Sequence, residues 1–220
     1  MEAKYMPSIF IALLTLGTPR VEHFENLLRW FLCGKYRLRY YPCVDVQPGY
    51  KARNVCHREF LKDSYDYLLF LDDDTIPPVD VIDRLLKANK DMISATVQTL
   101  FSDKGVPKLI PVAYRWNEDD PEDKGYKAYW GSGVEEVDVT TCACTLIKRK
   151  VLKVVGRGAF TNWHKDEWCI EGKSGDFCFS EKVRADGFRI WNDYGILCDH
   201  YKTFSAKKVN ELMLLASEGK

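Results

Sequence analysis

The chain has 220 residues, of which 46% are hydrophobic, and its 32 Lys and Arg balance 32 Asp and Glu, so the formal net charge is zero. This length suits one α/β domain with a large core, and the lack of a net positive charge argues against nucleic acid as a partner. We therefore expect a single domain over residues 1–220, with halves at 1–100 and 101–203 and a C-terminal helix at 204–220.

Strands and helices are predicted to alternate through the first half. Apolar runs predict strands at 8–15, 38–46, 67–71 and 92–97, and helices are predicted at 51–62 and 79–88. A further helix follows the first strand because apolar residues repeat there at helical spacing: Val21, Phe24, Leu27, Leu28 and Phe31. This alternation predicts a mostly parallel sheet with helices on both faces.

The second half is less regular. Residues 117–127 are polar and acidic and include Pro121 and Gly125, which indicates a solvent loop or a hairpin tip. A strand pair or bulged strand is predicted at 137–147, helices at 148–155 and 174–185, and two short strands around Tyr194-Gly195 between 189 and 200. A terminal helix is predicted at 210–218.

The eight cysteines lack the paired C-x-x-C spacing of a zinc site, and several lie in apolar runs. Reduced cysteines in such runs act as small hydrophobic residues, which favours a reducing compartment over a disulfide framework. The apolar run at 9–16 is too short to span a membrane and lacks a signal cleavage site. We expect a cytoplasmic protein without a transmembrane segment, and the sequence predicts no oligomeric state.

Three aspartates, Asp72, Asp73 and Asp74, follow the apolar strand at 67–71. Open α/β sheets bind ligands at the carboxyl ends of their strands. In an extended chain Asp72 and Asp74 project to one side, so two hard oxygen donors could serve one Mg²⁺ or Mn²⁺. The alternative is a solvated turn that caps the next helix, but a cap needs only one carboxylate and three repel one another. We therefore favour a metal or ligand site.

Several segments, in this order, resemble the GT-A glycosyltransferases, especially small family-2-like members. The segment 68–78 is similar to their D-x-D motif, and 175–184 is similar to their E-D-x-x-F-C helix. Other matching segments are Ala52-Arg53-Asn54, 144–152, 187–191 and Cys198-Asp199-His200. The chain departs from the family where Gly175 replaces an acid and where 141–143 replaces a glycine-rich turn.

This resemblance implies an α/β fold of the GT-A type and a hexosyltransferase. The enzyme would move a sugar from a nucleotide diphosphate sugar, by default a UDP-sugar, to a hydroxyl of a glycan or other acceptor. Asp72 and Asp74 would hold Mn²⁺ or Mg²⁺, with His200 completing the site, and Asp73 would face the ribose or the sugar. Asp176 would be the general base of an inverting reaction. A lone histidine is more often structural, and Asp176 could simply cap its helix.

Further donor contacts are predicted from position. Thr15, Leu16 and Gly17 end the first strand at the ligand edge and are candidates for contacts to the nucleoside. Arg53, near the start of a predicted helix, is unfavourably placed for the helix dipole. It would suit a diphosphate or a uracil edge, or an ion pair with a nearby carboxylate.

Three tryptophans in predicted loops are candidates for an acceptor site: Trp130, Trp163 and Trp168. Aromatic rings stack on sugar faces, although a buried core position is the default for tryptophan.

Other functions remain open. Asp72-x-Asp74 after a strand also resembles the haloacid-dehalogenase phosphatases, with Asp72 as nucleophile. Two strand–helix units precede it, however, and Ile76 and Ser180 stand where those enzymes need Thr or Val and a second acid. A non-catalytic nucleotide-sugar or glycan-binding protein is a second alternative. A sugar nucleotidyltransferase is a third, although 17–20 is a poor phosphate loop.

Overall fold

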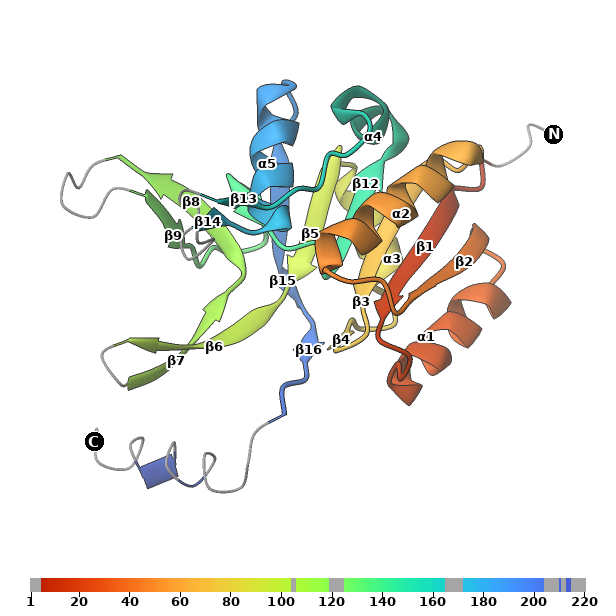
Figure 1. Cartoon of the computed structure of the whole chain (residues 1–220). Helices are drawn as coiled ribbons and strands as arrows, with labels where there is room; N and C mark the ends of the chain where they lie inside the picture. Colours follow the sequence, from red (N-terminus) through yellow and green to blue (C-terminus); the bar gives the residue numbers. More distant parts are fainter. Residues whose placement is uncertain are drawn as a thin grey trace.

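The computed structural model describes residues 5–103, 106–118, 125–164, 172–203, 210 and 213–214. Its centre is a seven-stranded sheet in the order β10-β15-β5-β12-β3-β1-β2 (Figure 1). The strands are β1 (Ser8–Thr15), β2 (Arg37–Val44), β3 (Tyr67–Asp72), β5 (Met92–Thr96), β10 (Val134–Val137), β12 (Cys144–Lys148) and β15 (Ile190–Leu197). β1, β2, β3, β5 and β15 run in one direction, and only β10 and β12 run in the other. The predicted mostly parallel sheet is confirmed.

Helices cover both faces of this sheet (Figure 1). α1 (Val21–Leu32) and α3 (Val81–Ala88) pack on one face, and α2 (Gly49–Lys62), α4 (Arg149–Val155) and α5 (Gly175–Ala185) pack on the other. Successive residues of β1 alternate between the two cores, with Ile9 and Ile11 on one side and Phe10 and Ala12 on the other. A strand buried on both faces must be apolar throughout, which explains the continuous apolar run.

Short strands flank the main sheet. β6 (Gln98–Asp103) pairs with β7 (Val106–Pro111), and β8 (Ala113–Asn117) lies between β9 (Gly125–Ala128) and β11 (Val139–Thr140). β13 (Trp163–His164) pairs with β14 (Gly172–Lys173), and β4 (Thr75–Ile76) pairs with β16 (Asp199–His200). The antiparallel pairing of β8 with β9 confirms the hairpin alternative for the polar stretch at 117–127.

Two predictions about strands need correction. The region 189–200 is not two strands broken at Tyr194-Gly195: β15 continues through both residues and the register shifts between Asp193 and Leu197. At this irregularity the Gly195 N–H donates a hydrogen bond of 2.9 Å to the side-chain oxygen Oδ1 of Asp193. The region 137–147 contains the last residue of β10 and the strands β11 and β12, and β11 and β12 join different sheets because the chain turns between them.

Helix α1 forms as predicted, but its apolar stripe faces outward. Val21, Phe24, Leu28 and Phe31 are between 47% and 66% exposed, and of the predicted stripe only Leu27 is buried. Most of the predicted helix at 210–218 lies outside the described residues. Over the part of the chain that the structure describes, no helix is long and apolar enough to cross a membrane.

Candidate functional site

A cavity of about 420 Å³ opens at the carboxyl ends of β1 and β3. Most of the predicted donor residues line it, namely Thr15, Leu16, Arg53, Asp72, Asp73 and Asp74. Gly17 is adjacent to this set, and its N–H donates to Thr15 Oγ1 at 3.0 Å. Sequence reasoning missed another part of the wall, residues 46–49, where the chain enters α2. The Pro48-Gly49 turn signal ahead of that helix could have indicated it.

Arg53 is the centre of this site. Its side chain is only 9% exposed and lies between two carboxylates. Nη2 donates to Asp72 Oδ2 at 3.0 Å and to Asp72 Oδ1 at 3.3 Å. Nε lies 3.1 Å from Asp176 Oδ1, an ion pair in which the buried N–H is not aligned for a hydrogen bond. The ion-pair alternative for Arg53 is therefore what the structure contains.

Burial and charge act together on this group. Burial alone would lower the pKa of Arg53, but the carboxylates of Asp176 and Asp72 outweigh it and raise that pKa above its usual value. Burial also raises the pKa of Asp72, the Arg53 guanidinium opposes the rise, and the charges of Asp176 and Asp74 add to it. The guanidinium is thus the charge that allows two carboxylates to lie in one small region.

Asp176 lies in the first turn of α5, as predicted. Its Oδ2 accepts hydrogen bonds from Thr141 Oγ1 at 3.2 Å and from the Cys142 N–H at 3.3 Å. The side chain is 24% exposed, so Asp176 is partly accessible to solvent. The turn between β11 and β12 therefore orients Asp176 toward Arg53.

Gly175 is explained by close packing and not by a positive φ angle. A Cβ on Gly175 would lie 2.7 Å from the Cβ of Tyr50 on α2, and Gly175 is not among the residues with positive φ. The contact brings the start of α5 against α2 and so places Asp176 beside Arg53. Any larger residue at 175, an acid included, would push these helices apart.

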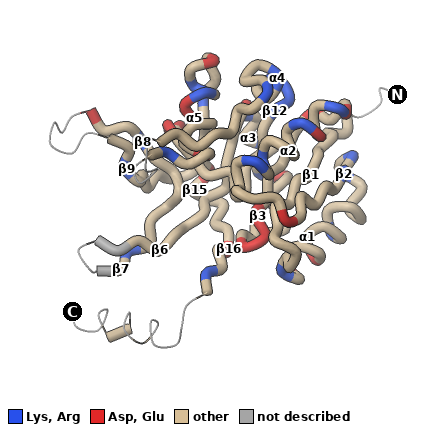
Figure 2. Tube along the Cα trace, viewed as in Figure 1, with Lys and Arg blue, Asp and Glu red and all other residues tan. Residues whose placement is uncertain are grey.

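Asp74 and His200 are brought together by the pairing of β4 with β16, which sets His200 opposite Thr75. His200 Nε2 lies 3.3 Å from Asp74 Oδ2, and Lys202 Nζ lies 2.8 Å from the same oxygen. The other ring nitrogen, Nδ1, is 2.6 Å from the Gln98 carbonyl oxygen. Figure 2 shows acidic residues gathered where β3 ends near β16.

These contacts shift the pKa values of both His200 and Asp74. The hydrogen bond to Asp74 raises the pKa of His200. Burial alone would raise the pKa of Asp74, but hydrogen bonds from His200 and Lys202 outweigh it and hold that pKa well below its usual range.

The three aspartates separate to different partners instead of alternating as in an extended strand. β3 ends at Asp72, so Asp73 and Asp74 lie in a turn, and Asp73 Oδ2 accepts the Leu16 N–H at 3.2 Å. The structure therefore brings Asp74 to His200 and Asp72 to Arg53. No group of three or more His, Cys, Asp or Glu side chains within the described ranges is arranged to hold a metal ion.

The predicted acceptor tryptophans are on the surface where the structure describes them. Trp130 is 52% exposed and Trp163, on β13, is 51% exposed. Trp168 lies outside the described residues. Neither of the two described rings is a core residue, so both could contact a ligand.

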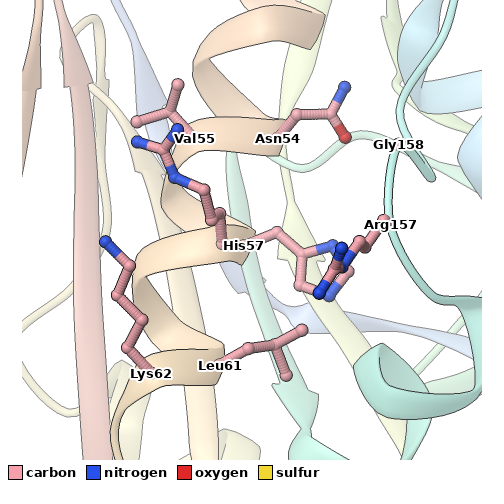
Figure 3. Close-up of a pocket in the computed structure, with 8 residues that line it drawn as sticks. Asn54, Val55, His57, Leu61, Lys62, Arg157 and Gly158 are labelled. Atoms are coloured by element: carbon pink, nitrogen blue, oxygen red, sulfur yellow. The ribbon is translucent and has the colours of Figure 1, made fainter.

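A second cavity, of about 650 Å³, lies on the other side of α2 (Figure 3). Asn54 closes one end by clamping the loop after α4, since its Nδ2 donates to the Phe160 carbonyl at 2.6 Å and its Oδ1 accepts the Phe160 N–H at 3.1 Å. His57 is buried there with Nε2 2.9 Å from the Leu152 carbonyl oxygen, and burial lowers the pKa of His57. α2 thus directs Arg53 to the candidate site and Asn54 to the structural clamp.

Solved structures with a similar fold include A197 from STIV and GalNAc-T7. A197 from STIV has 18% sequence identity and a TM-score of 0.59, over 90% of this chain and 87% of that one. GalNAc-T7, solved with UDP, GalNAc and Mn²⁺, has 10% identity and a TM-score of 0.53, over 98% of this chain. The match covers 48% of the GalNAc-T7 chain, so the present chain spans about half of it. No protein-family model and no curated protein matches the sequence. At these identities the likeness establishes the fold, and the predicted α/β fold of the GT-A type is confirmed.

Proposed function

We propose that the protein is a glycosyltransferase that moves a sugar from a UDP-sugar to a hydroxyl acceptor with the help of Mn²⁺ or Mg²⁺. The observation that carries this proposal is the shared cavity at the end of β1 and β3, where Arg53 and the three aspartates meet the predicted nucleoside contacts Thr15 and Leu16. The ligand edge of an open α/β sheet lies at this end of its strands. GalNAc-T7, which shares the fold, was solved with UDP and Mn²⁺.

Asp74 and His200 would supply two ligands to a divalent cation, which would displace Lys202 Nζ from Asp74 Oδ2. A carbonyl oxygen can only accept, so His200 Nδ1 must donate to Gln98, and in the neutral ring Nε2 then presents a lone pair toward the Asp74 carboxylate. Two such groups repel unless a proton or a cation lies between them, and fixing one imidazole nitrogen by a carbonyl is how proteins orient metal-binding histidines. A bound divalent cation supplies neutralisation of the charge that grows on the departing diphosphate.

In this proposal Arg53 positions Asp72 and contributes positive charge to the donor site. Its Nη2 fixes Asp72 at the end of β3, and its positive charge at the cavity wall would attract a diphosphate. Asp176 receives the proton of the acceptor hydroxyl as that oxygen attacks the anomeric carbon, which would invert it. Thr141 and the Cys142 N–H hold this carboxylate in one orientation, and the side chain stays partly exposed.

The acceptor is proposed to lie on the side of Trp130 and Trp163, whose exposed rings are suited to stacking on a sugar face. No specific observation favours the phosphatase. Both carboxylate oxygens of Asp72 face the Arg53 guanidinium, and Ser180, where that chemistry needs a second acid, is buried against Thr140.

Thermal denaturation with a panel of nucleotide sugars tests donor binding. A ligand at about 100 times its Kd adds about 2.7 kcal/mol, which raises the melting temperature of a chain of this size by roughly 5–10 °C. We expect this shift with UDP-sugars and Mn²⁺, and we expect it to disappear in EDTA and in Asp74→Ala. Asp176→Asn should keep the shift and lose sugar transfer. A shift that is the same in EDTA and in Asp74→Ala would contradict the metal assignment, and full transfer by Asp176→Asn would contradict the base.

A further inference from the structure

The outward face of α1 is apolar. The exposed fractions of its side chains are 66% for Val21, 47% for Phe24, 62% for Leu28, 48% for Phe31 and 82% for Leu32. Monomeric proteins tolerate single exposed apolar residues, but five on one helix face form a continuous patch of the kind found at interaction sites. We call these five residues the α1 patch.

The helix cannot turn this patch inward. Its inward face is polar in part and is fixed by hydrogen bonds to the segment that precedes α3. Asn26 Nδ2 donates to the Pro77 carbonyl at 2.8 Å, and Trp30 Nε1 donates to the Val79 carbonyl at 2.7 Å. Rotation of α1 would break both bonds and would leave buried polar groups without partners. The exposure of the patch is therefore built into the fold.

The spacing of the patch is that of a helix–helix seam. Val21, Phe24, Leu28 and Phe31 follow one another at intervals of three, four and three residues. Apolar residues at alternating intervals of three and four place a narrow stripe along one side of a helix, and two such stripes interdigitate when helices pack side by side. The surface thus fits another helix better than an extended peptide.

The charged residues beside the seam are complementary to those of an inverted second copy of the helix. Glu25 and Arg29 are exposed along one flank, and neither side chain forms an ion pair with another residue in the described part of the chain. Glu22 lies on the same flank and forms an ion pair with Arg20, at 3.6 Å. One flank therefore carries acids near the start of the helix and a base one turn later, which is the pattern that an inverted copy of itself would satisfy.

We propose that the α1 patch is the interface of a two-fold dimer in which α1 packs antiparallel against α1 of a second copy. With a rise of about 1.5 Å per residue and a two-fold axis near residue 26, Arg29 lies roughly 4–5 Å to one side of the axis. On that same side lie Glu25 and Glu22 of the second copy, at roughly 1.5 and 6 Å. A parallel pair would instead set the charged flank of one helix against the Leu27 side of the other.

The area fits a weak dimer. At roughly 100 Å² for each of the five side chains, the two copies would bury about 1,000 Å², which is the lower limit for a specific interface. We therefore expect a dissociation constant on the order of 10 µM. A membrane surface fits less well, because the acids Glu22 and Glu25 balance Arg20 and Arg29 and the face has no excess positive charge.

Sedimentation velocity of the full chain, from roughly 1 to 300 µM, tests the proposal across the expected dissociation constant. The parent should shift from monomer to dimer. Leu28→Glu should weaken association at least tenfold without lowering the melting temperature, because Leu28 is already exposed. Val154→Glu is the matched control, since Val154 is an apolar residue 56% exposed on α4, on the other face of the sheet, and it should dimerise like the parent.

Charge exchange tests the antiparallel arrangement. Glu25→Arg and Arg29→Glu should each weaken the dimer, and the two together should recover part of the loss, because positions 25 and 29 again carry opposite charges while Glu22 is unchanged. A chain that stays monomeric at every concentration would overturn the proposal. So would a dimer that Leu28→Glu leaves intact, a double exchange weaker than both single variants, or a monomer that binds vesicles of anionic phospholipid through Leu28. None of these results depends on donor binding.

Discussion

Replacing Arg53 by alanine should destabilise the protein strongly even without any ligand. The change removes the one cation between Asp72 and Asp176 and leaves two carboxylates close together. Removing one partner of a fully buried ion pair costs about 3–5 kcal/mol. Here the two carboxylates are 27% and 24% exposed, so water screens part of the repulsion, and we expect about 2–3 kcal/mol.

For a chain of this size, that loss lowers the melting temperature by roughly 5–10 °C, which circular dichroism can follow at neutral pH. Arg58→Ala is the matched control on the same helix. Its side chain is 65% exposed and pairs with Glu59 at the surface, so the change should stay within about 0.5 kcal/mol. Adding Asp72→Asn to Arg53→Ala should recover part of the loss. An Arg53→Ala protein that melts at the same temperature as the parent, or that is no less stable than Arg58→Ala, would refute the reasoning.

Three further changes test other parts of the structure. Burial would raise the pKa of Asp66, but hydrogen bonds from Ser8 outweigh it and lower that pKa below its usual value of 3.8. The ionised Asp66 therefore stabilises the fold above that pH, and this stabilisation is lost as the pH falls through the lowered pKa. The stability gap between parent and Asp66→Asn, from urea titrations, should therefore narrow below about pH 4, and a constant gap would exclude this role. Asn54→Ala breaks two bonds to the Phe160 backbone and should cost about 1–3 kcal/mol in the same titration, and Asn54→Asp, which sets a carboxylate oxygen against the Phe160 carbonyl, should cost at least as much. Gly175→Ala should cost about 1–3 kcal/mol by overpacking against α2 and should reduce sugar transfer, and a variant with parent stability would show that the helices can separate freely.

The sheet could be predicted because its strands are buried on both faces. Runs such as 8–15 and 67–71 are apolar throughout, and alternation with helices then limits the topology to a few arrangements. The same logic failed at α1. Helical spacing shows that a helix forms but does not show which side faces the core. That side is fixed by the hydrogen bonds that Asn26 and Trp30 donate to the segment before α3.

The sequence predicted which residues belong to the candidate site better than it predicted how they are arranged. The aspartates, Arg53 and the first strand end share a cavity because parallel strands end at one edge. Which partner each aspartate contacts depends on where β3 ends. Because β3 ends at Asp72, Asp74 does not continue the strand but lies in a turn, where it contacts His200. The reason for Gly175 lies in Tyr50, more than one hundred residues away in the chain, and no local pattern reveals that contact.

The most direct measurement of the proposed chemistry is ³¹P NMR of a UDP-sugar incubated with the protein and Mn²⁺, with water or an added glycan as the acceptor and with the Mn²⁺ removed before the spectrum is taken. Transfer from the anomeric carbon leaves both phosphates on the nucleotide, so the account predicts UDP as the only new phosphorus species, formed by the parent and lost in EDTA and in Asp74→Ala. Release of UMP with a sugar phosphate, or of inorganic phosphate, would show cleavage at phosphorus and would contradict it. So would a UDP-sugar that stays intact with every acceptor tried.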